Sequence, residues 1–175
     1  MKVFIGYATT EGQSRKVARW ASDRLVDDGH SVELMALADG DDLDLSRFDR
    51  AVLIASIHAS HYQSSLAEFV TQHDAWLGTH PALFLSLSLA AAGHDAEDWR
   101  TLDKIAADFS AATGWTPGVI EHVAGAYKPS QYDILKRFIM RRIVAAKNPE
   151  ADPNLDHEYT DWDGLADRVD QWMAS

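Results

Sequence analysis

The residues best able to do chemistry lie in one short loop near the start of the chain. Residues 2–7 form an apolar run rich in strand formers, and a helical pattern begins at Gly12. Hydroxyl groups surround that glycine at Thr9, Thr10 and Ser14. Because the first N–H groups of a helix lack internal partners and carry partial positive charge, such a loop can bind a phosphate. A simple helix N-cap by Thr9 or Thr10 is the alternative, and the local pattern leaves both open.

The same loop excludes some phosphate-containing ligands and is similar to the phosphate loop of flavodoxins. It lacks the three glycines of a dinucleotide fingerprint and the Gly-Lys-Ser/Thr ending of a P-loop. The flavodoxin loop reads Thr/Ser-x-Thr/Asp/Glu-Gly-x-Thr/Ser, and it is matched position by position by Thr9, Glu11, Gly12 and Ser14. That loop wraps the single phosphate of FMN, so the resemblance implies FMN as the cofactor. The residues expected to hold it are Thr9, Thr10, Glu11, Gly12, Gln13 and Ser14.

Strand and helix patterns alternate along the chain. Apolar runs typical of strands cover residues 2–7, 31–37, 50–57, 82–89 and 117–124. Helical spacing covers residues 12–28, 64–76, 95–113, 132–147 and 162–173, with a polar loop at 148–158. This alternation predicts a single α/β domain over residues 1–175: a doubly wound, five-stranded parallel sheet with helices on both faces. The flavodoxin likeness implies the strand order 2-1-3-4-5, with strands one, three and four ending around one crevice.

Two further loops are expected to meet the phosphate loop at that crevice. Residues 56–62 follow the third strand and residues 88–94 follow the fourth, and small residues are frequent in both. Small side chains and backbone amides suit close approach to a flat ring, so these loops are expected to flank the flavin. The residues concerned are Ser56, Ile57, His58, Ser88, Leu89, Ala90 and Ala91.

The histidines of these loops allow one catalytic hypothesis. His58 is a candidate for an acid/base group or for stabilising a reduced flavin, because an unperturbed histidine titrates near neutrality. The alternative is an ordinary loop histidine, and that is the expectation for His61. Metal binding by His58, His61 and His94 is not expected, since no carboxylate lies at a matching spacing. The acidic loop around Gly40 is expected to be a solvated surface.

Charge and composition bound the class of protein. The formal net charge is −11, yet residues 125–148 hold six basic residues against one acid, a local balance of +5 that leaves −16 elsewhere. An acidic body argues against a nucleic-acid partner. Zero cysteines exclude disulfides, thiolate metal sites and cysteine catalysis, so redox chemistry needs a bound cofactor. No apolar run approaches the roughly 18 residues that span a bilayer, and no leader pattern precedes the first strand, which predicts a cytoplasmic protein.

The basic segment predicts an amphipathic helix with three possible uses. Its apolar residues share one arc, and most of its basic residues lie opposite. The apolar set is Ile134, Leu135, Phe138, Ile139 and Ile143; the basic set is Lys136, Arg137, Arg141 and Lys147, with Arg142 projecting from within the apolar arc. Such a helix can lie on an anionic membrane, cover the sheet, or bind an anionic ligand.

Over nearly all of its length the chain resembles one branch of the flavodoxin superfamily, the flavodoxin-type, quinone-dependent protoporphyrinogen oxidases. At residues 9–15 this chain reads Thr-Thr-Glu-Gly-Gln-Ser-Arg where the family favours Thr-x-Asp-Gly-Gln-Thr. Further matches lie at residues 55–70, at residues 124–126 and in the terminal Tyr159-Thr160-Asp161-Trp162. The basic insertion at about residues 125–158 separates this branch from carrier flavodoxins.

The resemblance implies an FMN-dependent enzyme of haem biosynthesis. It would oxidise protoporphyrinogen IX to protoporphyrin IX in three two-electron steps, pass the electrons to a respiratory quinone, and work at the periphery of the inner membrane. The insertion would meet the membrane, the porphyrinogen or both, and Tyr132 lies near its start. Its residues are Tyr127, Lys128, Lys136, Arg137, Arg141 and Arg142. The alternatives are a flavodoxin-like electron carrier, an FMN-dependent quinone or NAD(P)H reductase, and a domain without cofactor; a homo-oligomer stays open.

Overall fold

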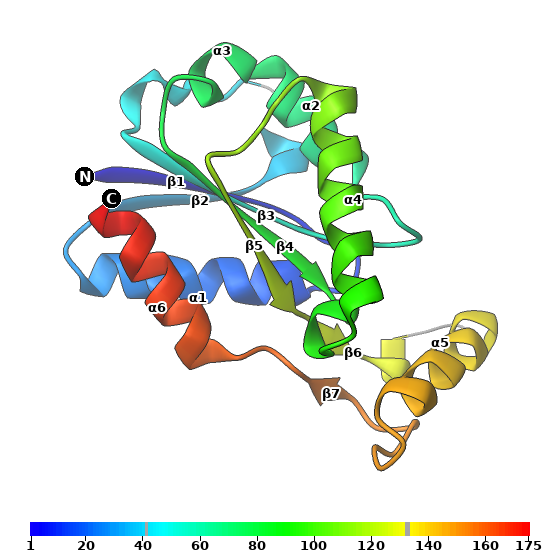
Figure 1. Ribbon diagram of the computed structural model, residues 1–175. Helices are drawn as coiled ribbons and strands as arrows, with labels where there is room; N and C mark the ends of the chain where they lie inside the picture. Colours follow the sequence, from blue (N-terminus) through cyan, green and yellow to red (C-terminus); the bar gives the residue numbers. More distant parts are fainter. Residues whose placement is uncertain (41, 132–133) are drawn as a thin grey trace.

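The computed structural model describes residues 1–40, 42–131 and 134–175, and at 131, 134–139 and 147 it describes the backbone only (Figure 1). Five parallel strands form one sheet in the order β2-β1-β3-β4-β5. The strands are β1 (Lys2–Ala8), β2 (Ser31–Ala36), β3 (Arg50–Ser56), β4 (Ala82–Ser88) and β5 (Val119–Ala124). The predicted fold class and strand order are confirmed.

The middle of the sheet is buried on both faces. Along β3, Val52 and Ile54 pack into one core cluster, and Leu53 between them packs into the other. This alternation follows from the two-residue period of a strand, whose successive side chains point to opposite faces. Because both faces are covered, the strand needs apolar residues at every position, which explains its near-continuous apolar run.

Helices cover the two faces in separate groups (Figure 1). One face carries α1 (Gln13–Asp27) and α6 (Trp162–Ala174), and the other carries α2 (Ser64–Gln72), α3 (Asp74–Leu77) and α4 (Ala96–Thr113). On the first face, Val17 of α1 and Val169 of α6 pack with Ile5 of β1. On the second face, Phe69 of α2 stacks on Phe4 of β1. The sheet is therefore held between two helical layers, and its carboxyl edge is left for loops.

The insertion is a small subdomain that projects beyond this carboxyl edge (Figure 1). It comprises β6 (Ala126–Tyr127), the 3-10 turn η4 (Pro129–Gln131), α5 (Ile134–Lys147) and β7 (His157–Glu158). β6 and β7 pair antiparallel, and Tyr127 and Val144 are buried together in a core of their own. Beside them pack Leu89, Met140, Ala151 and Tyr159. The insertion is thus folded on the end of the sheet rather than laid across a face.

Several element boundaries differ from prediction for local reasons. The fifth strand begins at Val119 instead of 117, because Pro117 has no N–H for the ladder. The helix predicted over 64–76 is two helices that divide at His73. The segment predicted as a polar loop contains β7, which pairs with β6 across the base of the insertion. The basic helix is described from Ile134 onward, and Tyr132 lies outside the described residues.

Candidate functional site

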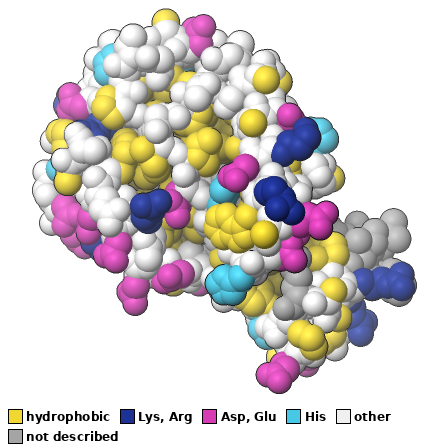
Figure 2. Space-filling model, viewed as in Figure 1, with side chains coloured by type: hydrophobic (Ala, Val, Ile, Leu, Met, Phe, Trp, Pro, Cys, Tyr) yellow, Lys and Arg dark blue, Asp and Glu magenta, His cyan; other side chains and the backbone are white. Residues whose placement is uncertain are grey.

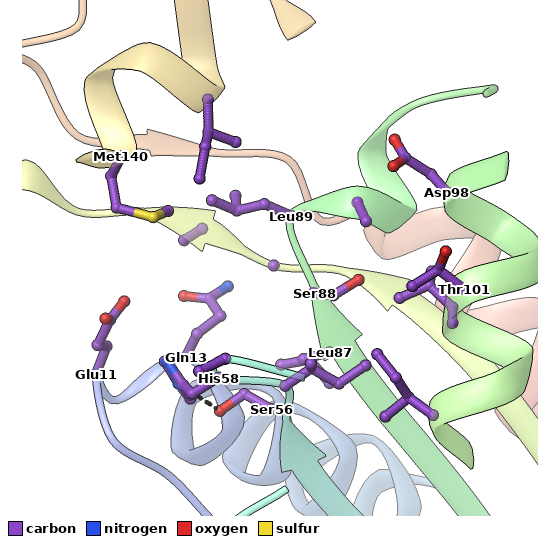
Figure 3. Close-up of a pocket in the computed structure, with 18 residues that line it drawn as sticks. Glu11, Gln13, Ser56, His58, Leu87, Ser88, Leu89, Asp98, Thr101 and Met140 are labelled. Carbon is purple, nitrogen blue, oxygen red and sulfur yellow. Dashed lines mark hydrogen bonds between the residues drawn. The ribbon is translucent and has the colours of Figure 1, made fainter. Parts of the chain in front are cut away.

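A cavity of about 370 Å³ lies at the carboxyl edge, where β1, β3 and β4 end (Figure 3). The loops after all three strands line it, as expected for strands that meet at a topological switch point. The lining residues from these loops are Glu11, Gln13, Ser56, Ile57, His58, Ala59, Leu87, Ser88, Leu89 and Ala90. Of the other predicted cofactor residues, Thr9, Thr10, Gly12 and Ser14 lie in the adjoining loop, and Ala91 lies one residue beyond the lining.

Gly12 forms the turn that starts α1. Its φ of 84° is in the left-handed region, which residues with a side chain rarely adopt, and nothing lies within 4 Å of an added Cβ. Its N–H donates to Thr9 Oγ1 at 2.8 Å. Gly12 itself is the N-cap residue, and no side chain caps the helix. The structure therefore makes Gly12, and not Thr9 or Thr10, the N-cap residue, and in the described part of the chain no cap side chain accepts from the first N–H groups of α1.

Two polar side chains at the head of α1 are buried with unmet hydrogen bonds. Ser14 is fully buried and Gln13 is 6% exposed. Within the described part of the chain, neither Ser14 Oγ nor Gln13 Oε1 has a hydrogen-bond partner. Buried polar atoms are usually satisfied, so atoms like these mark a place where a ligand can supply the partner. Together with the uncapped start of α1, they make this loop fit a phosphate group.

A hydrogen-bonded network joins Gln13 to the segment that returns from the insertion. Gln13 Nε2 donates to Glu158 Oε2 at 3.1 Å and to Thr160 Oγ1 at 3.2 Å. Thr160 in turn donates to the carbonyl of Ala124 at the end of β5. Burial alone would raise the pKa of Glu158, but the hydrogen bonds from Lys16, Gln13 and Trp162 outweigh it and hold this pKa below its ordinary value. Glu158 is therefore a charged anchor for the phosphate loop.

The second loop turns sharply at the mouth of the cavity. His58 and His61 exchange both backbone hydrogen bonds, at 2.8 and 3.0 Å, around a two-residue turn. Ala59 and Ser60 at its tip have φ values of 48° and 66°, which are uncommon for residues other than glycine. The turn leaves His61 exposed and places the half-buried His58 in the cavity wall, with its Nε2 3.1 Å from Ser56 Oγ. The two histidines thus differ in position: His58 lines the cavity and His61 is exposed to solvent outside the lining, and a catalytic role for His58 stays a prediction.

Gln63 ties the first loop to the second, a role that the sequence does not reveal. Its Nε2 donates to Ser56 Oγ at 2.8 Å and to Thr10 Oγ1 at 3.2 Å. Thr10 is therefore placed by a residue 53 positions away. A glutamine just before α2 has no local pattern that marks it as part of a site, so only the folded chain shows it.

The third loop is shaped by Ser88. Its Oγ accepts from the N–H of Ala91 at 3.1 Å, and its carbonyl accepts from the N–H of Gly125 at 2.9 Å. The first bond starts the 3-10 turn η3 (Ala90–Ala92), and the second joins the ends of β4 and β5. Ser88, Leu89 and Ala90 line the cavity, and contact of this loop with a flavin ring stays a prediction. His94 is exposed, and the described residues contain no group of three side chains suited to a metal ion.

The fourth wall of the cavity comes from α4 and the insertion. From α4 it is formed by Asp98, Thr101, Leu102 and Ile105, and from the insertion by Gly125, Ala126, Met140 and Ile143. The α4 residues are spaced so that they share one helix face. That spacing is the signal by which the sequence could have identified them. Asp98 and Thr101 are polar, however, and polar residues on a helix are usually predicted to face solvent.

The insertion residues predicted to meet a membrane or a substrate are placed differently from one another. Tyr127 is fully buried, and its hydroxyl donates to Pro153 O at 2.8 Å, so it stabilises the insertion and offers no surface to a membrane. Lys128 donates to the carbonyl of Glu11 in the phosphate loop at 3.3 Å. Arg141 and Arg142 are exposed on α5. The side chains of Lys136 and Arg137 lie outside the described part of the structure.

None of the helices that the structure describes combines the length and the apolar character that a bilayer span requires.

The chain is similar to a known domain and to known proteins. The flavodoxin domain model matches residues 4–154. The protoporphyrinogen IX dehydrogenase [quinone] of Escherichia coli (strain K12) is 29% identical over 95% of this chain and 91% of its own length. The protein of the same name from Leishmania major is 25% identical over 92% of this chain and 70% of its own.

A solved structure supports the fold. Oxidised Flavodoxin 1 from Bacillus cereus matches with a TM-score of 0.51 at 12% identity, over 87% of this chain and all of the other. At this identity the likeness concerns the arrangement of strands and helices alone. The domain match, however, covers most of the sequence. The chain belongs to the flavodoxin family.

Proposed function

We propose that this protein binds FMN and oxidises protoporphyrinogen IX, passing the electrons to a quinone. The observation that carries the proposal is the cavity itself, in which an uncapped helix start, two small-residue loops and a basic insertion meet. The similarity to protoporphyrinogen IX dehydrogenases over nearly the whole chain supports the same reading. The enzyme would thus act in haem biosynthesis, as the family resemblance of the sequence implies.

The head of α1 is the part of the site that would hold the phosphate of FMN. Backbone N–H groups at the helix start and the Ser14 hydroxyl are donors of the kind a phosphate accepts from. Bound FMN supplies the two-electron redox chemistry that this cysteine-free chain cannot supply itself. The loops at Ser56–His58 and Ser88–Ala90 would wall its ring.

The insertion side of the cavity suits a large apolar substrate. Leu89, Met140 and Ile143 give the insertion side of the cavity an apolar surface that excludes water from the reacting atoms. Oxidation also releases protons. Among the described residues, the titratable side chains that line the cavity are Glu11, His58 and Asp98. We propose that His58 takes the proton, because an imidazole in the cavity wall can act as a general base.

Anaerobic titration tests the proposal directly. Purified protein is loaded with FMN, mixed with protoporphyrinogen IX, and followed by flavin absorbance and porphyrin fluorescence. We expect loss of flavin absorbance in step with rising fluorescence, and recovery of the absorbance when a quinone is added. A flavin that ignores protoporphyrinogen but is bleached by NADPH would make the protein a reductase. A protein that retains no FMN would refute the cofactor as well.

A further inference from the structure

The insertion contacts the phosphate loop from two sides. On one side Lys128 Nζ donates to the carbonyl of Glu11 at 3.3 Å. On the other, the Glu158 carboxylate accepts from Gln13 and from Lys16. Antiparallel pairing of β6 with β7 places Ala126 opposite Glu158, so both contacts start from the same two-stranded base. The base of the insertion and the loop therefore form one hydrogen-bonded unit.

The Lys128 contact brings a positive charge to a loop that has none of its own. The loop from Thr9 to Ser14 contains no basic residue, and its one ionic side chain is the acid Glu11. A dianionic phosphate in this loop would rely on backbone N–H groups and hydroxyls. Lys128, half-buried and distant in sequence by 117 positions, brings an ammonium group to the loop backbone. An ammonium this close to the loop attracts a phosphate and does nothing comparable for an uncharged ligand group.

We propose that Lys128 is a specificity-determining residue, which makes the protein select a flavin that carries a phosphate over one that does not. The inference rests on the proposed FMN function and adds to it a role for the insertion. The insertion is then part of the cofactor site as well as a wall of the cavity.

A second consequence follows from linkage. If the docked insertion strengthens phosphate binding, phosphate binding must stabilise the docked insertion by the same factor. The insertion offers a convenient probe, because Arg141 and Arg142 are exposed on α5 and trypsin cleaves after arginine. Cleavage there requires local opening of the helix, so its rate reports how firmly the insertion is docked.

Binding of two flavins separates phosphate selection from general effects. Dissociation constants for FMN and for riboflavin, which lacks the phosphate, are measured for wild type and Lys128→Gln. We expect FMN affinity to fall roughly fivefold or more while riboflavin affinity stays within twofold. Lys104→Gln on α4 is the matched control, since it removes the same charge from an exposed position. Equal losses for both flavins, or an FMN loss in the control as large as in Lys128→Gln, would overturn the proposal.

Limited trypsin digestion tests the reciprocal effect. At saturating flavin, we expect cleavage after Arg141 and Arg142 to be slower with FMN than with riboflavin in wild type, and this difference to shrink in Lys128→Gln. Identical cleavage rates with the two flavins would contradict the linkage. If wild type binds FMN, and Lys128→Gln has the same flavin affinities and cleavage rates as wild type, only this inference fails. If wild type binds no FMN, the proposed function fails with it.

Discussion

The backbone conformation of Gly12 is expected to affect both stability and FMN binding. Its φ of 84° disfavours any side chain, although the space around it is open. Gly12→Ala is therefore expected to cost about 1 kcal/mol of unfolding free energy through backbone strain alone. The same strain should also distort the loop at residues 9–14, which we propose holds the phosphate of FMN. FMN affinity should fall, and denaturant unfolding together with flavin titration measures the two effects.

A second glycine provides the control for this prediction. Gly29, beyond the other end of α1, has the same φ of 84° and equally open surroundings. Gly29→Ala should lose a similar amount of stability while keeping wild-type FMN affinity. A loss of affinity in both variants would mean that strain in α1, and not the geometry of the loop, controls binding.

Glu158 joins two elements that are far apart in sequence, β7 of the insertion and the start of α1. Its pKa is lower in the folded chain than in the unfolded one, so its charged form stabilises the fold above the unfolded value, about 4.5. That contribution is lost as the pH falls through the lower folded pKa. Glu158→Gln should thus be less stable than wild type at pH 7, and the difference should shrink as the pH falls below about 4.5 and through the lower folded pKa. Denaturant unfolding across this range measures it, and a difference that stays constant would show that charge is not involved.

The elements differ in how readily the sequence reveals them. β3 and β4 could be predicted because burial on both faces favours a nearly continuous apolar run, which in β4 is interrupted at the buried Ser86. β6 and β7 have two residues each, too few to show any period, and their pairing depends on a return of the chain after α5. A strand that short is recognised only when its partner is known.

Some residues of the candidate site could likewise be predicted from the sequence, and others could not. The loop at residues 9–14 is contiguous, so residue types and spacing are enough to propose it as a phosphate site. Glu158 and Gln63 were missed because their contacts span 145 and 53 positions. Tyr127 was misassigned since an aromatic residue in a basic segment resembles a membrane anchor, whereas here burial gives the insertion a core. Local pattern thus identifies candidate ligand-binding loops, and the folded chain is needed for the residues that hold those loops in place.

In the whole molecule, positive and negative charge are unevenly distributed between the insertion and the rest of the chain. Residues 125–148 carry +5 and the rest of the chain carries −16, but four of the acids outside that segment, Glu150, Asp152, Asp156 and Glu158, also belong to the insertion that projects from one end (Figures 1 and 2). The excess positive charge of the projecting end therefore lies in the segment that contains α5, and an anionic surface attracts that segment while it repels the acidic body. The molecule should therefore approach an anionic membrane with the insertion, and thus with one wall of the cavity, toward the lipid.

Exchange of both exposed arginines of α5 tests this orientation. Each basic residue near an anionic surface contributes about 1 kcal/mol, so Arg141→Gln with Arg142→Gln should weaken binding to phosphatidylserine-containing vesicles by roughly thirtyfold. The matched control, Arg100→Gln with Lys104→Gln, removes two exposed charges from α4 of the body and should leave binding within a few-fold of wild type. Vesicle co-sedimentation at low and high salt measures both variants, and added salt should weaken wild-type binding because the attraction is screened. Equal losses in the two variants would show that net charge alone matters, and no loss in either would exclude this face of α5 as the membrane contact.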